Sequence, residues 1–160
     1  MSHDKNSRPI YIASNINDFR LPGATNSNFL NALAELFGIQ WQAAEVGETY
    51  LGYLLVQDEA IFLGTNRKHK RCRQLLSAAH LLGHYLLEHY TPGRAMICYG
   101  FARNQLREME ADTFAEELLM PRDRLIELAE LCTPEQITHK LEVPLAVLRR
   151  RLDELQQPAR

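Results

Sequence analysis

The sequence of 160 residues contains little cysteine and almost no excess of either charge. Its three cysteines, Cys72, Cys98 and Cys132, are widely spaced and form no CxxC motif. This pattern argues against a disulfide scaffold and favours reduced thiols in a cytoplasmic protein. The formal net charge of −2 excludes a general electrostatic attraction to nucleic acid, so any DNA contact would need a local basic patch.

Long apolar runs are also absent. The longest one, at residues 75–87, contains two histidines and is too short to cross a bilayer. Residues 1–10 carry charges with no apolar core after them, so we expect no secretory signal. The overall balance, 46% hydrophobic and 24% charged, is typical of a soluble chain that buries a core.

The hydrophobic periodicity predicts a mostly helical α+β fold with a small antiparallel β-sheet and a C-terminal helix pair. A short strand is expected at residues 9–14, and Asn26 or Ser27 is expected to cap a helix that ends at Gly38. Further strands are expected at residues 39–46, 50–56 and 60–65, and further helices at residues 67–90, 104–120, 122–131, 134–141 and 144–155. The expected organisation is an N-terminal segment (1–25), a main domain (26–132) and a helix-turn-helix-like pair (133–160) that belongs to the same domain.

Two histidines, His80 and His84, lie four residues apart in the helix expected at residues 67–90. Their imidazoles would project from one face about one turn apart, close enough to bind one metal ion. Burial of both in an apolar helix is costly unless each has a partner. Two core histidines bonded to the backbone or to each other would show the same spacing, so the pair needs a third ligand to indicate a metal site.

The helix expected at residues 104–120 supplies carboxylates for that third ligand. Glu110 interrupts its apolar face, and a buried carboxylate is rare without a partner. With His80 and His84, a carboxylate such as that of Glu110 would complete the His2Glu set of a catalytic zinc site, which leaves one position for water. Other donors, less favoured because they fit a solvated face or lack ligand-like spacing, are Glu108, Glu116, Glu117, Cys72 and Cys98.

Two segments of the chain resemble the signature segments of the ImmA/IrrE family of zincin-type metallopeptidases. SAAHLLGHYLLEH (77–89) is similar to the family's LAHELGHYLLHH, and REMEADTFAEELLMP (107–121) is similar to its EREANxFAAELLMP. LEVPLAVLRRRLDEL (141–155) resembles its GVSxxALRRRLxEL helix, and the order of elements agrees from about residue 29 to 155. The resemblance implies a zincin-like fold, zinc ligands at His80, His84 and Glu110, and substrates that are transcriptional repressors of phage, mobile-element or stress-response genes.

One position departs from the family's HExxH motif. Leu81 stands where the family has glutamate, the general base that takes a proton from water. Leucine cannot accept a proton, and general acid–base assistance contributes about 10²–10⁴ in rate. We therefore expect a trace of hydrolysis at most, while zinc can still bind because no ligand is lost.

The sequence therefore predicts a catalytically impaired ImmA/IrrE-like module that binds a protein partner, a repressor-type transcription regulator. An extended partner segment would add to a sheet edge, and the expected edge strand carries Ala60, Ile61, Phe62 and Leu63.

Two alternatives stay open. One is an active zinc metalloendopeptidase that takes its base from elsewhere in the fold or from a partner and cleaves a transcriptional repressor. The other is a DNA-associated regulator that uses the last two helices, with Arg149, Arg150 and Arg151 contacting phosphate. Asp153 and Glu154 follow these arginines directly, which disfavours direct DNA binding.

Overall fold

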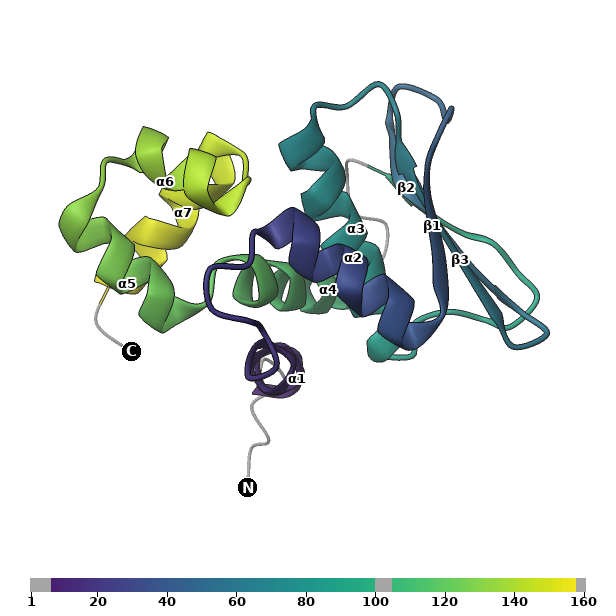
Figure 1. Ribbon diagram of the computed structural model, residues 1–160. Coiled ribbons are helices and arrows are strands. Elements are labelled where there is room, and N and C mark those ends of the chain that lie inside the picture. Colours follow the sequence, from purple (N-terminus) through teal and green to yellow (C-terminus); the bar gives the residue numbers. More distant parts are fainter. Residues whose placement is uncertain (1–6, 100–104, 158–160) are drawn as a thin grey trace.

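The computed structural model describes residues 7–99 and 105–157, which form an α+β fold, as predicted, with helices outweighing strands (Figure 1). The described elements in chain order are α1 (Ser7–Asn17), α2 (Asn26–Phe37), β1 (Ile39–Ala44), β2 (Tyr50–Gln57), β3 (Ala60–Asn66), α3 (Arg71–Leu86), β4 (Met96–Tyr99), α4 (Gln105–Leu119), α5 (Arg122–Leu131), α6 (Pro134–Leu141) and α7 (Leu145–Gln156).

The sheet is mixed rather than antiparallel, and its strand order is β1-β3-β2-β4. β2 and β3 form a hairpin whose turn places Asp58 and Glu59 at positive φ, the conformation that a two-residue hairpin turn requires. β1 instead runs parallel to β3, with Ile39 opposite Ile61. β3, which includes Ala60 to Leu63, therefore lies between two strands, so the prediction that it is a free edge is wrong.

The first helix and the last strand both differ from the sequence prediction. Residues 9–14, expected to be a strand, lie in α1, which packs on α4 with Ala13 fully buried. Within the described part of the chain this short apolar run pairs with no strand, and packing against α4 decides its conformation. The segment at residues 96–99, where no strand was expected, is the strand β4, because it pairs antiparallel with β2.

A buried asparagine, Asn26, fixes the start of α2 against the C-terminal half of the chain. The N-cap itself is Thr25, whose hydroxyl accepts from the Asn28 amide at 3.1 Å, so neither Asn26 nor Ser27 has the predicted capping role. The Asn26 amide instead donates to the carbonyl of Leu119 at 2.9 Å and to that of Leu141. This side chain joins α2 to the ends of α4 and α6.

α3 lies on the sheet and carries α4 on its other side, while α5, α6 and α7 gather at the far end of the molecule (Figure 1). Close approach of α3 and α4 depends on Gly83, because a Cβ there would lie 2.8 Å from the ring of Phe114 and 3.3 Å from the Ala111 Cα. The missing side chain at Gly83 therefore lets α3 pack directly against α4.

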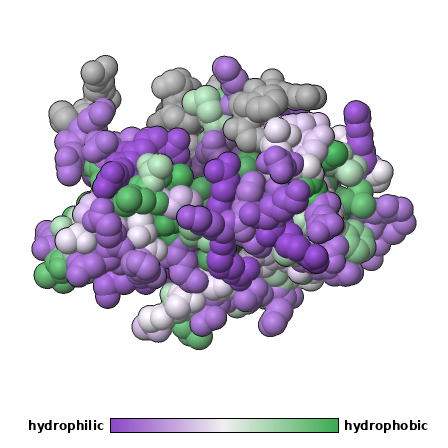
Figure 2. Space-filling view, turned by 90° about the horizontal axis from the view of Figure 1, so that it is seen from above, coloured by the Kyte–Doolittle hydropathy of each residue, from purple (hydrophilic) through white to green (hydrophobic). Residues whose placement is uncertain are grey.

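Within residues 7–99 and 105–157, no helix is both long and apolar enough to cross a bilayer. Seen from above, the molecule is mainly hydrophilic, with apolar side chains scattered among polar ones (Figure 2).

Candidate metal centre

The side chains of His80 and His84, both on α3, lie next to each other in the interface between α3 and α4. His80 is 3% exposed and His84 is fully buried, and their Nε2 atoms are 3.0 Å apart. The four-residue spacing places both rings on one face of the helix, as predicted. Both Nε2 atoms therefore point at the same small volume.

α4 supplies a carboxylate to this volume, and the carboxylate is that of Glu108. Its Oε2 lies 3.0 Å from Nε2 of His80, and its Oε1 lies 3.4 Å from Nε2 of His84. Glu110, the predicted third ligand, instead pairs with His89, with 3.1 Å between Oε2 and Nε2. The structure therefore places a different glutamate of the same helix beside the histidine pair.

The difference follows from the rotation of α4. Residues two apart on a helix lie about 200° apart around its axis, so Glu108 and Glu110 cannot face one point. The apolar face that Glu110 was expected to interrupt would include Leu106 and Met109, but both are at least half exposed, and the buried face runs through Ala111, Phe114, Ala115 and Leu118. The four-residue spacing of Glu108 and Asp112 is a signal that could have identified the correct face.

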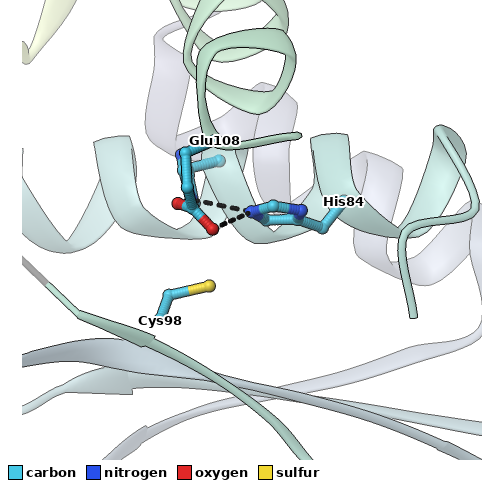
Figure 3. A group of neighbouring side chains, drawn as sticks. His84, Cys98 and Glu108 are labelled. Carbon is cyan, nitrogen blue, oxygen red and sulfur yellow. Dashed lines mark hydrogen bonds and ion pairs between the residues drawn. The ribbon is translucent and has the colours of Figure 1, made fainter. Parts of the chain in front are cut away.

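β4 contributes a thiol to the same volume. The Cys98 side chain is 2% exposed, and its sulfur lies with one donor atom each of His80, His84 and Glu108 in a group within 4.8 Å of one another. Figure 3 shows the sulfur pointing from the sheet toward the Glu108 carboxylate and the His84 ring. Sequence spacing gave no sign of this contact, because β4 was not predicted.

Asp112 fixes the tautomer of His80. Its Oδ1 lies 2.8 Å from Nδ1 of His80, so the ring donates its Nδ1 proton to the carboxylate. A neutral imidazole that donates from Nδ1 keeps a lone pair on Nε2. Carboxylates that orient a histidine in this way are the usual support of metal-binding imidazoles.

A second chain of contacts fixes the tautomer of His84. His89 donates from Nε2 to Glu110, which leaves its Nδ1 as an acceptor. That atom lies 3.0 Å from Nδ1 of His84, so His84 donates there and keeps its own lone pair on Nε2. Glu110 thus influences the tautomer of His84 indirectly, through its contact with His89.

These donors fit a zinc ion. Two nitrogen lone pairs, a carboxylate and a sulfur face one buried volume, an arrangement that is repulsive without a cation or extra protons between them. Tetrahedral zinc with ligands at about 2.0–2.1 Å separates neighbouring nitrogen or oxygen ligands by about 3.3 Å, close to the 3.0–3.4 Å found among His80, His84 and Glu108. Zinc bound here would act as a Lewis acid.

The histidines and the acidic groups of the cluster shift one another's pKa values in opposite directions. Burial lowers the pKa of His80, but hydrogen bonds to Asp112, Cys98 and Glu108 outweigh it and raise that pKa well above its ordinary value. Burial raises the pKa of Glu108, yet its hydrogen bonds to His80 and His84 bring it down to about 2. The pKa of the Cys98 thiol is also lowered, because contacts with the two histidines outweigh burial.

Leu81 follows His80 in α3, and its side chain packs against the sheet. It is fully buried, and its Cδ1 lies 3.0 Å from the position that a Cβ on Gly52 would take. Gly52 stands opposite Cys98 in the pairing of β2 with β4. The residue at the general-base position of the resemblance is therefore an aliphatic group held in the core, next in sequence to His80.

The three arginines of α7 are engaged with carboxylates. Arg150 pairs with Glu116 and Arg151 with Glu117, both on α4, while Arg149 reaches Glu135 at 3.0 Å. Arg151 and Glu117 are each less than 15% exposed. These ion pairs hold α7 on α4 and account for Glu116 and Glu117, which lie outside the histidine cluster.

A groove opens onto the cluster from the side of α7. It has a volume of about 280 Å³, and His80, Glu108 and Asp112 form its polar part. The rest of its lining comes from α3, from the neighbouring strands and from the start of α7, through Arg73, Leu76, Ser77, Leu51, Tyr99, Pro144, Ala146 and Val147.

Comparisons with known proteins agree with this architecture. No curated protein matches the chain. A solved structure described as a Mycobacterium tuberculosis transcriptional regulator is similar in fold, with a TM-score of 0.61 and 16% identity over 98% of this chain and 48% of the regulator. The chain thus spans about half the length of that regulator. The IrrE N-terminal-like domain family (Peptidase_M78) matches residues 34–153, which include both helices of the cluster and the sheet. The chain therefore belongs to the IrrE N-terminal-like domain family.

Proposed function

We propose that this chain is a zinc-holding, catalytically impaired member of its family that binds a segment of a repressor-type transcription regulator without efficient cleavage. The metal ligands in this proposal include His80, His84 and Glu108. We place the protein in the cytoplasm, because a reduced thiol at Cys98 suits a reducing compartment.

The observation that carries the proposal is the buried Leu81 beside the cluster. A general base must come within hydrogen-bond reach of the proton that it removes, and an alkyl side chain has no acceptor. Among the described residues, the carboxylates nearest the histidines already contact imidazoles. Glu108 contacts His80 and His84, Asp112 accepts from His80, and Glu110 accepts from His89. These contacts favour binding over hydrolysis.

The binding surface in this proposal is the groove together with the outer edge of β4. β4 ends the sheet and pairs with β2 on one side, so its other side is the candidate edge in place of β3. An extended segment bound there by strand addition would place its side chains over the groove beside His80. The fold neighbour is described as a transcriptional regulator, which is consistent with a partner of this class.

The cleavage half of the proposal is tested with zinc-loaded full-length protein and a library of internally quenched peptides. We expect no zinc-dependent cleavage from the wild type. Cleavage that requires zinc and disappears in His80→Ala would instead establish the active-peptidase alternative.

The binding half is tested by calorimetry against purified helix-turn-helix repressors from the same genome. Ala146 is exposed at the rim of the groove, so Ala146→Arg should weaken binding at least tenfold by filling it. Leu131→Arg, at a position 83% exposed on α5, is the matched control and should bind like the wild type. Equal binding by both variants would exclude the groove as the partner site.

The ion pairs of Arg149, Arg150 and Arg151 do not favour the DNA-binding alternative. Guanidinium groups already neutralised by carboxylates are poor phosphate ligands, since each pair must be broken first. We also propose that α6 and α7 form one structural unit with the preceding helices.

A further inference from the structure

We infer that Cys98 is a fourth protein ligand to the metal, so that the site is closed and holds the ion structurally. The inference rests on the proposed function, in which zinc binds to His80, His84 and Glu108. It adds a sulfur ligand from the sheet to donors that come from two helices.

The backbone of β4 aims Cys98 at the cluster. Side chains alternate across a strand, and here Ile97 is 49% exposed while Cys98 is 2% exposed and faces α3. The residue opposite Cys98 on β2 is Gly52, where a Cβ would lie only 2.1 Å from the carbonyl oxygen of Gly64. A Cβ on Gly52 would also lie 3.0 Å from Cδ1 of Leu81, so the absence of a side chain there leaves room for Leu81 beneath α3.

The charges of the four donors balance a divalent cation. Two neutral histidines, one carboxylate and one thiolate bring two negative charges to Zn²⁺ and give a neutral site. Without the thiolate, the ion and its donors would keep one net positive charge, which Asp112 offsets only in part, because its carboxylate lies behind His80 and is 59% exposed to water. Three of the four residues are almost completely buried, so charge balance has a strong effect here.

The number of ligands separates two kinds of zinc site. Catalytic sites have three protein ligands and leave a position for water, whereas structural sites have four protein ligands and are closed. With Cys98 bound, the position that a reacting water needs is already taken. The loss of the base at Leu81 and the gain of a sulfur ligand are therefore two independent barriers to hydrolysis.

The test uses metal-free full-length protein titrated with Co²⁺ in place of zinc. A thiolate ligand produces a sulfur-to-cobalt charge-transfer band in the near ultraviolet, and tetrahedral cobalt produces intense visible bands. We expect both in the wild type and in the control Cys132→Ser, whose sulfur lies at the end of α5. Cys98→Ala should lose the charge-transfer band and bind cobalt at least tenfold more weakly.

X-ray absorption of the zinc-loaded wild type gives the same answer without a substitution. One sulfur at about 2.3 Å supports the inference. A shell of nitrogen and oxygen alone, or a charge-transfer band that persists in Cys98→Ala, overturns it. Neither result alters the proposed function, which fails instead through zinc-dependent cleavage by the wild type.

Activity of two variants supplies a further check. If both barriers exist, Leu81→Glu alone stays inactive against the quenched peptides, and Leu81→Glu with Cys98→Ala gains cleavage. Full cleavage by the single variant Leu81→Glu would show that the fourth position is open and would refute the closed site.

Discussion

Replacement of the two glutamates of α4 by glutamine should affect zinc binding very unequally. Glu108→Gln removes a charge that contacts both Nε2 atoms at 3.0 and 3.4 Å. Glu110→Gln leaves every ligand in place and disturbs His84 only through His89, across contacts of 3.1 and 3.0 Å. The two substitutions are alike in size and charge, so their difference measures position alone.

The expected magnitudes follow from these roles. Loss of a supporting contact behind a metal ligand typically costs about 10–100-fold in affinity, and this is the range we expect for Glu110→Gln. It corresponds to about 1.4–2.8 kcal/mol, since each factor of ten is about 1.4 kcal/mol. Glu108→Gln should exceed that range, because it removes a ligand and leaves a net positive charge in a buried site.

Competition with a chelator of known zinc affinity measures both variants on one scale. Glu130→Gln, at an exposed position of α5, is the control and should bind zinc like the wild type. If Glu110→Gln costs as much as Glu108→Gln, or more, then Glu110 is the ligand and the assignment of tautomers along His84 and His89 is refuted.

Three further outcomes follow from the structure. Because the pKa of His80 is raised well above its ordinary value, zinc must displace a proton at neutral pH. Zinc affinity should therefore rise about tenfold per pH unit for each displaced proton between pH 6 and 8, and a flat profile in the same competition assay would contradict this. Asn26→Ala leaves two buried carbonyls without donors and should lower the free energy of unfolding by about 2–4 kcal/mol in urea. A loss below about 1 kcal/mol would mean that water replaces the amide. Gly83→Ala pushes on Phe114, so it should cost about 1–3 kcal/mol and also weaken zinc binding by separating α3 from α4. Unchanged zinc affinity in that variant would show that the cluster tolerates the shift.

The local sequence pattern determined the helices from α2 onward and the histidine pair, while α1 was expected to be a strand. Helical periodicity and capping residues are short-range signals, so α5 and α6 begin and end at the predicted residues. The spacing of His80 and His84 is a property of one helix, and it fixed their common face without reference to the rest of the chain. The departure at Leu81 was likewise visible in the sequence, since it needs only the residue type.

Tertiary structure decided which other groups join that pair. Spacing shows which residues of α4 share a face, but not which face turns toward α3, so Glu108 rather than Glu110 meets the histidines. Cys98 comes from a strand that exists only through its pairing with β2, and β3 becomes central only because β1 pairs beside it. Such contacts join segments far apart in the chain, and their free energy depends on packing that no local pattern encodes.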